Sequence, residues 1–397
     1  MSSDPGPTIL KFGGTSVEDA AAFERVARIV GAAQHAHPVV VASAMSRMTD
    51  ALLDVVQLAA SGDPARARAE LSGHLERHAG VADALLSPAG AVPVHSALRD
   101  TRREIGDLLR VIAAHPGTRR PLRDEVVSYG ERLSSLLLAA VLRAHDLPAR
   151  WVDARDCIRT DEEHGRAAPL PEPTERCTRA HLLPPLEEGE IPVLGGFVGA
   201  AESGATTTLG RGGGDYTAAL VGAALGAREI QIWTDVTGFL TADPRVVPQA
   251  RRIDHLSYEE AAELAYFGAK VLHPKTIQPA VERGIPVRIC NSRAPEAGST
   301  LIDGRVEPSV GGVRAIAHKT GITVLRVTSA RMLGAHGFLR ALFEVFARHR
   351  TAVDVVTTSE VSVSLSLEET YALETILAEL RSLGEVVRRL HAVFFER

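Results

Sequence analysis

A stretch of hydroxyl, glycine, arginine and aspartate residues near the middle of the chain has the composition of an anion-binding turn. Residues 206–217 read TTTLGRGGGDYT, so three threonines lead into a glycine turn that carries Arg211 and is followed by Asp215. Glycines lack a Cβ atom, which lets backbone N–H groups approach an anion closely. Residues 218–225 predict a helix whose positive end adds to the attraction, and the Arg211 fork fits a carboxylate or phosphate. A flexible surface loop is the alternative, but the charged residues within the turn favour an anion site.

A second glycine turn follows the first predicted strand, residues 8–12. Lys11 lies at the end of this strand and can point its ammonium into the turn, which reads GGTS at residues 13–16. Ser16 and Asp19 have the spacing of a capping box, and apolar residues at helical spacing follow. Strand, glycine turn and helix N-terminus form the geometry that holds phosphate. An ordinary βα turn with a surface lysine is an equally good interpretation of this motif alone.

Strands alternate with helices over residues 8–290, which predicts a mostly parallel α/β sheet covered on both faces. The further strands are expected at 38–42, 151–153, 191–194, 230–233 and 286–290. Residues 60–125 are rich in Ala, Leu, Arg and Glu and predict a helical excursion with a solvated charged face. The polar, proline-rich segment 159–183 predicts a loop with little structure. A helix is expected at 133–142, which places Glu131 just before its first turn.

The pattern changes after residues 294–315, which are rich in glycine, proline and polar residues and predict a linker. Beyond them, strands are expected at 321–327, 353–357, 361–367 and from 386 onward, and helices at 338–349 and 373–383. This βαββαβ order over about 75 residues predicts a small ferredoxin-like module.

Composition and charge exclude several classes of protein. The length of 397 residues predicts two or three domains, and the net charge of −5 is spread over the chain, with no basic footprint for nucleic acid or membrane. The three cysteines are scattered without metal-ligand spacing and suit a reducing compartment. No apolar run is long enough to span a bilayer, and the N-terminus lacks the pattern of a signal peptide. We therefore expect a soluble cytoplasmic protein with no metal site of its own.

Five motifs stand in the order seen in the aspartate kinases (aspartokinases), which belong to the amino acid kinase fold. They are KFGGTS at 11–16, TTTLGRGGGD at 206–215, WTDV at 233–236, DPR at 243–245 and FGAKVLHP at 267–274. The C-terminal part resembles the regulatory ACT domain of that family. The resemblance covers almost the whole chain. It implies an amino-acid kinase-like sandwich at 1–303, a linker at 304–319 and an α+β ferredoxin-like ACT domain at 320–397. The second ACT module usual in the family is absent or truncated here.

The resemblance also implies a reaction, the ATP-dependent phosphorylation of the β-carboxylate of L-aspartate to 4-phospho-L-aspartate. In the family this is the first step of lysine, threonine and methionine biosynthesis. A carboxylate is already an anionic nucleophile, so catalysis consists of positioning and charge neutralisation. Mg²⁺ is expected on phosphate oxygens, because it prefers phosphates and water to an all-protein cage.

Matching the motifs residue by residue gives the expected roles. The catalytic residues are Lys11 and Asp215. The aspartate-binding residues are Ser43, Thr49, Glu131, Arg211, Gly212 and Gly213, with Arg211 on a carboxylate and Glu131 on the ammonium. The nucleotide-binding residues are Lys11, Gly13, Gly14, Thr15, Thr234, Asp235, Leu240, Arg245, Lys270 and Val271. The effector-binding residues are Met332, Gly337, Phe338, Leu339, Val353, Asp354, Ser359 and Glu360.

The chain departs from the family pattern at two positions in the catalytic half. Leu240 stands where related enzymes often carry a tyrosine near the nucleotide, and Arg47 stands where they often carry glycine. In the regulatory half, Glu360 suits a cationic side chain, so L-lysine is the expected effector. A single ACT module is expected to pair with that of a second chain in a homodimer. The competing expectation is an enzyme without feedback control.

Two other functions are compatible with parts of the sequence. A glutamate or acetylglutamate kinase would share the fold, but the KFGGTS start and the ACT tail argue against it. A catalytically silent amino-acid-binding regulator would keep only the ACT sensor. The presence of Lys11, Glu131, Arg211, Asp215 and Lys270 argues against that reading.

Overall fold

The computed structural model describes residues 6–115, 119–269, 271–306, 312–329, 332, 336–367 and 370–381. The chain divides into two compact units between Ala317 and His318. Among the helices of the described residues, none combines the length and the hydrophobicity needed to cross a membrane.

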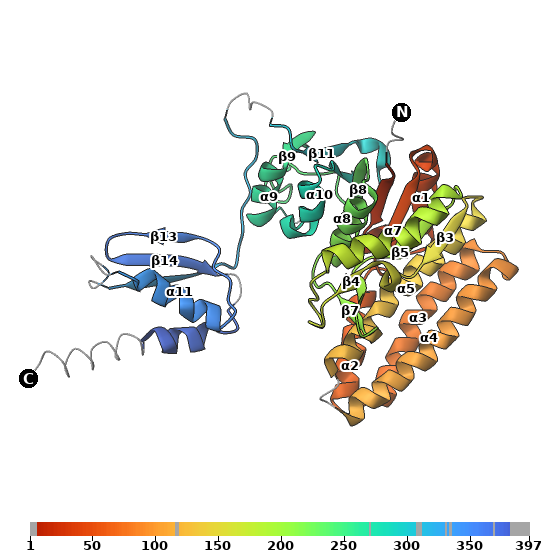
Figure 1. Cartoon of the computed structure of the whole chain (residues 1–397), viewed down its shortest axis with the longest axis horizontal. Coiled ribbons are helices and arrows are strands. Elements are labelled where there is room, and N and C mark those ends of the chain that lie inside the picture. Colours follow the sequence, from red (N-terminus) through yellow and green to blue (C-terminus); the bar gives the residue numbers. More distant parts are fainter. Residues whose placement is uncertain are drawn as a thin grey trace, which may run out of the picture. The chain divides into compact units, whose positions relative to one another are not determined.

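Eight described strands form one sheet through the first unit (Figure 1). They are β1 (Thr8–Phe12), β2 (Pro38–Ala42), β3 (Ala149–Val152), β5 (Ile191–Gly195), β8 (Glu229–Thr234), β9 (His255–Ser257), β10 (Val287–Asn291) and β11 (Ser299–Asp303). Their order is β3-β5-β2-β1-β8-β10-β11-β9. All neighbours pair in parallel except β10 and β11, which are antiparallel. The predicted mostly parallel sheet is thus confirmed.

Helices cover both faces of this sheet. They are α1 (Ala20–Ala32), α2 (Met48–Ala60), α3 (Pro64–Leu85), α4 (Pro88–Ala114), α5 (Arg119–Ala144), α6 (Ala154–Cys157), α7 (Pro171–Glu187), α8 (Gly213–Leu225), α9 (Tyr258–Tyr266) and α10 (Gln278–Glu282). Short 3₁₀ helices lie at Gly14–Val17, Gln34–Ala36, Pro274–Ile277 and Pro295–Ala297. A second, small sheet has the order β4-β6-β7, with β4 (Arg159–Thr160), β6 (Val198–Ala201) and β7 (Thr206–Thr208).

The central strands are buried on both faces, which explains their continuous apolar sequences. Every residue of β1 and β2 is buried. Leu10 and Phe12 belong to a core shared with α1 to α5, whereas Ile9 belongs to a second core shared with α8. A strand covered on both sides needs apolar residues in consecutive positions rather than in alternation. This is why the run PVVVA alone predicted β2 correctly.

The helical excursion predicted at 60–125 is confirmed as α3, α4 and the start of α5. The loop predicted at 159–183 is wrong, because most of that segment forms α7. Pro171 stands in the first helical turn, where the missing N–H costs nothing. Leu182 is buried in the core beside α8, so apolar packing stabilises a helix that its prolines seemed to forbid.

The expected start of a helix after Glu131 is also wrong. α5 runs from residue 119 to residue 144, so Glu131 lies in its middle rather than before its first turn. Gly130, one residue before Glu131, allows a close approach between α5 and a neighbouring loop. A Cβ atom there would lie 2.9 Å from the Cβ atom of Ala44. The glycine thus lets α5 pack against the loop after β2.

Three further boundaries differ from the sequence expectation. Ser16 does not cap α1; Asp19 does, by accepting from the backbone N–H of Ala22 at 2.8 Å. The helix expected at 218–225 begins five residues earlier, so Asp215 lies within its first turn. The segment 294–315 is not only a linker, since β11 lies inside it and pairs with β10. The pairing of β11 with β10 involves residues farther apart in the sequence than a local pattern spans, whereas the cap of α1 is a choice between two nearby side chains.

The second unit contains β12 (Thr323–Thr328), α11 (Phe338–Arg348), β13 (Val356–Thr358), β14 (Ser362–Leu367) and a helix at 373–381. Its strands form an antiparallel sheet of order β12-β14-β13. Leu342, Phe346, Val363 and Leu365 form the centre of its core. This agrees with the predicted ferredoxin-like order. The strand expected from residue 386 lies outside the described residues.

Candidate active site

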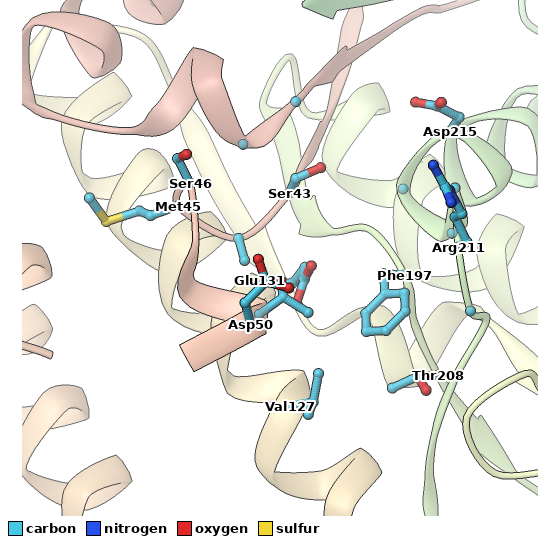
Figure 2. A pocket seen from close by; sticks show the side chains of 18 of the residues that line it. Ser43, Met45, Ser46, Asp50, Val127, Glu131, Phe197, Thr208, Arg211 and Asp215 are labelled. Atoms are coloured by element: carbon cyan, nitrogen blue, oxygen red, sulfur yellow. The ribbon is translucent and has the colours of Figure 1, made fainter. Parts of the chain in front are cut away.

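A cleft of about 830 Å³ opens beyond the carboxyl ends of β1, β2 and β8. Ligands bind at this edge of open α/β sheets. The cleft is lined by most of the residues that the motifs predicted: Lys11, Gly13, Gly14, Thr15, Ser43, Thr49, Glu131, Arg211, Gly212, Gly213, Asp215, Thr234 and Asp235. Figure 2 shows Glu131 on one side of this cleft and Arg211 and Asp215 on the other.

An ion pair joins the two glycine turns. Lys11 Nζ lies 2.7 Å from Asp215 Oδ1, and both side chains are nearly buried. A Cβ atom on Gly214 would lie 3.1 Å from Ser43 Oγ and 3.2 Å from Lys11 Cε. The glycine therefore allows the lysine, the serine and the start of α8 to meet. Backbone N–H groups, a lysine and a helix N-terminus converge here, as in phosphate sites.

Backbone hydrogen bonds hold the two loops beside Lys11 in place. The N–H of Gly13 donates to the carbonyl of Trp233 at 3.0 Å, and the N–H of Ser46 donates to the carbonyl of Gly14 at 3.1 Å. Arg77, on α3, donates to the carbonyls of Ser46 at 2.8 Å and Glu18 at 3.2 Å. The charges of the excursion were expected to form a solvated face. For Arg77 that is wrong, because it reaches the site loops.

Glu131 projects from α5 into the cleft. It is only 4% exposed, and its Oε2 atom has no hydrogen-bond partner among the described residues. Burial raises the pKa of this carboxyl to about 8, against the opposing effects of a backbone hydrogen bond with Ala44 and the charge of Lys11. A Cβ atom on Gly195 would lie 3.0 Å from Glu131 Cβ, so the glycine lets α5 approach the end of β5. An unsatisfied buried acid that faces a cleft is suited to a cationic ligand.

Arg211 stands between two glycines with left-handed backbone. Gly210 has a φ of 75° and Gly212 a φ of 76°, and Gly212 immediately precedes α8. The Arg211 side chain is exposed and lines the cleft. A guanidinium here can hold a carboxylate at the end of the cleft opposite Glu131.

Some predicted nucleotide residues do not line the cleft. Leu240 bridges to Arg252, and Val271 is half-buried outside the cleft lining. Arg245 is highly exposed and pairs with Asp243 at 2.6 Å. Lys270 lies outside the described residues.

The predicted effector residues divide into four places in the second unit. Gly337, with a φ of 85°, Phe338 and Leu339 form the start of α11. Val353 and Asp354 precede β13, and Ser359 and Glu360 lie in the turn between β13 and β14. Met332 packs against the core of the unit.

Several residues of the cleft were missed from the sequence. They are Asp50, Arg123, Asp124, Val127, Gly165, Phe197 and Thr208. Of these, only Thr208 belongs to one of the five motifs. Asp124, for example, accepts hydrogen bonds from Gly165 and Thr208, which lie far from it in the sequence. Arg47, noted as a departure from glycine, keeps the left-handed conformation that glycine would favour, with a φ of 66°. Such a conformation costs a non-glycine residue about 1–2 kcal/mol.

Comparison with known proteins shows the family. The amino acid kinase family model matches residues 6–291. The lysine-sensitive aspartokinase 3 of Escherichia coli (strain K12) is 40% identical over 389 residues, which cover 95% of this chain and 84% of that protein. The chain is an aspartokinase of the amino acid kinase family.

Solved structures agree with this assignment. The crystal structure of E. coli aspartokinase III in complex with aspartate and ADP (R-state) matches this aspartokinase with a TM-score of 0.81 and 41% identity, covering 92% of this chain and 79% of that one. Its complex with lysine and aspartate (T-state) matches with a TM-score of 0.80 and 40% identity, covering 95% and 83%. The expectation of an aspartokinase is thus confirmed over that of a glutamate-type kinase.

Proposed function

We propose that this aspartokinase phosphorylates the β-carboxylate of L-aspartate with Lys11 and Asp215 at the transferring group. The ion pair between these residues, at the meeting point of the two glycine turns, is the observation that carries the proposal. A β-carboxylate oxygen attacks the γ-phosphorus of ATP, the bond to the β-phosphate oxygen breaks, and ADP leaves. Lys11 neutralises the charge of the transferring group, and no base is needed because the nucleophile is already ionised.

The two ends of aspartate have matching partners across the cleft. Arg211 holds the α-carboxylate and Glu131 holds the ammonium, which directs the β-carboxylate toward Lys11. Ser43 and Thr49, on the loop and helix after β2, add hydroxyl contacts. The buried carboxyl of Glu131 needs a cation to satisfy it, and this supports the orientation.

ATP binds with its phosphates over Gly13, Gly14 and Thr15, in this proposal, and with Thr234 and Asp235 beside it. For Leu240, Arg245, Lys270 and Val271 a nucleotide contact stays a prediction. Within the described residues, no group of three or more His, Cys, Asp or Glu side chains could hold a metal. A magnesium ion that arrives with ATP would be held by phosphates and water, and Asp215 or Asp235, which both line the cleft, could supply a single carboxylate ligand. Such an ion neutralises phosphate charge.

We further propose that L-lysine inhibits the enzyme through the second unit and that two chains pair through it, in the cytoplasm. The E. coli relative has been crystallised with lysine and is named lysine-sensitive. Here Glu360 is exposed beside Ser359 and can bind a cationic side chain. Among the strands that the structure describes, β12 and β13 stand at the edges of their sheet, and their residues Val324 and Val356 are 65% and 44% exposed. Open edges of this kind favour pairing with a second copy.

Product trapping tests the reaction. The purified chain is incubated with ATP, Mg²⁺ and L-aspartate, L-glutamate or N-acetyl-L-glutamate, and hydroxylamine converts any acyl phosphate to a hydroxamate. We expect hydroxamate only with aspartate. Equal product from glutamate, or ADP release without hydroxamate, would contradict the proposal.

Titration with lysine tests the regulation separately. We expect millimolar lysine to lower turnover and to increase the dimer fraction in sedimentation, because an effector shifts a population only through differential affinity. Glu360→Gln should weaken both effects without changing turnover in the absence of lysine. A monomer whose turnover ignores lysine would contradict the regulatory proposal and leave the kinase reaction intact.

A further inference from the structure

A buried carboxylate on α5 connects three segments of the cleft wall. Asp124 is 1% exposed and lines the cleft. Its Oδ2 atom accepts from the backbone N–H of Gly165 at 2.7 Å and from that of Thr208 at 3.1 Å. The Nδ1 atom of His164 lies 3.3 Å from the same oxygen, and Arg123 Nη2 lies 3.5 Å from Oδ1. One side chain thus joins α5, the loop 161–168 and the end of β7.

The loop 161–168 in turn lies against the backbone that carries Arg211. The N–H of Ala167 donates to the carbonyl of Thr208 at 2.9 Å. A Cβ atom on Gly210 would lie 3.3 Å from the carbonyl oxygen of Gly165. Gly165 has a φ of 89°, which strains any other residue, and a Cβ atom there would lie 2.0 Å from Arg123 Nη2, so the arginine side chain would have to move. The backbone before Arg211 is therefore enclosed by segments that Asp124 fixes.

The same helix carries the opposite end of the substrate site. Asp124 precedes Glu131 by two turns of α5, about 10 Å along the helix axis. Both side chains reach the cleft, Glu131 directly and Asp124 through the Gly165 and Thr208 backbone. α5 thus carries Glu131 itself and, through Asp124, binds the backbone that precedes Arg211.

We infer that Asp124 is a positioning residue that fixes Arg211 relative to Glu131 and so sets the length of amino-acid acceptor that the site takes. It touches neither aspartate nor ATP in this role; it acts through the backbone on either side of the glycine turn. The inference rests on the proposed contact between Arg211 and the aspartate carboxylate. A small displacement of a substrate-holding group reduces the fraction of productive complexes steeply.

Two substitutions separate the hydrogen bonds of Asp124 from its charge. Asp124→Asn keeps an oxygen that can accept from Gly165 and Thr208, whereas Asp124→Ala removes both bonds. We expect Asp124→Ala to raise the KM for aspartate about tenfold or more, to leave the KM for ATP within about twofold, and to lower the preference for aspartate over glutamate. Asp124→Asn should restore the KM for aspartate to within about threefold of the native value.

Asp303 offers a matched control. Its carboxylate is also largely buried and accepts from a backbone N–H, that of Arg305 at 2.8 Å, and from His255 at 2.9 Å, but it does not line the cleft. Asp303→Ala should lower the melting temperature without changing the KM for aspartate. A folded Asp124→Ala enzyme with native KM and native preference would overturn the inference, as would an equal rise in both KM values. Arg211→Lys is measured in the same assay. If its KM for aspartate stays native, the proposed contact between Arg211 and aspartate is wrong; if that KM rises while the KM of Asp124→Ala stays native, only the inference about Asp124 is wrong.

Discussion

Lys11 Nζ and Asp215 Oδ1 lie 2.7 Å apart and join the end of β1 to the first turn of α8. The two side chains are only 11% and 14% exposed, so water screens this pair weakly. The carboxylate orients the ammonium toward the cleft before any phosphate arrives. In the proposed reaction, the positive charge is then in position for the transfer step, and little reorganisation would be needed.

Removing this charge tests the placement of Lys11. Lys11→Ala should lower kcat by roughly 100-fold or more with little change in either KM, because the charge acts mainly on the transition state. Lys275→Ala, which removes an exposed lysine outside the cleft lining, is the control and should keep native turnover. A folded Lys11→Ala enzyme with turnover within a few-fold of native would show that the placement is wrong.

Changing the guanidinium of Arg211 tests substrate recognition. Arg211→Lys keeps the charge but loses the two parallel donors, so the KM for aspartate should rise about tenfold and the KM for ATP much less. Initial rates at varied aspartate and varied ATP give both constants. Arg283→Lys, at an exposed position that pairs with Glu175, is the matched control. Equal increases in the two constants would place Arg211 at the phosphates instead.

The acidity of Glu131 predicts a pH dependence of aspartate binding. With a pKa of about 8 in the empty cleft, the carboxyl is protonated at neutral pH and must release its proton to pair with an ammonium. The KM for aspartate should therefore fall about tenfold for each pH unit from 6 to 8 and then level off. The KM for ATP serves as the internal control, and Glu131→Gln should remove the slope. A native KM for aspartate that is flat between pH 6 and 8 would refute this assignment.

The Glu131 carboxyl also predicts a pH dependence of the protein's stability in the absence of substrate. Because its pKa in the folded protein is raised from 4.5, its contribution to stability is complete below pH 4.5 and is lost as pH rises through 8. Glu131→Gln should thus gain stability relative to the native protein between pH 5 and 8. Thermal unfolding of the two proteins over this range measures the difference.

His78 predicts an opposite trend at acidic pH. It is 1% exposed on α3, and burial lowers its pKa from 6.5 to about 4. The unfolded chain therefore binds the proton first, so stability is complete above pH 6.5 and is lost as pH falls toward 4. At 1.4 kcal/mol per pKa unit the loss is about 3 kcal/mol. Denaturant unfolding of His78→Leu should lack this loss, whereas His35→Leu, at an exposed histidine, should keep it. If the free energy of unfolding depended on pH in the same way for the native protein and for His78→Leu, the prediction would be wrong.

The sequence predicted the residues at the centre of the cleft because their chemistry is local. Lys11 ends β1 of the parallel sheet, and Arg211 lies in the glycine turn after β7 of the small sheet, so each turn could be recognised from its own residues. Continuous apolar runs predicted the buried strands in the same way, because a strand that is buried on both faces has apolar residues at consecutive positions.

The supporting residues could not be predicted, because their partners lie far away in sequence. Asp124 binds backbone groups 41 and 84 residues further along the chain, and nothing in its neighbourhood indicates that contact. The errors in α5 and α7 have a different origin. The composition of 159–183 predicted a loop and the apolar run 133–142 a short helix, whereas tertiary packing stabilises longer helices in both places.

The close approach between Gly195 and Glu131 limits how this enzyme can be re-engineered for another acceptor. A side chain at Gly195 would displace α5, and a Cβ atom on Gly196 would lie 2.7 Å from Gly214 Cα. A mutagenesis library should therefore leave these two glycines unchanged and vary Val127 and Phe197, which line the cleft. Changes at those positions alter the volume available to the acceptor while the catalytic frame keeps its geometry.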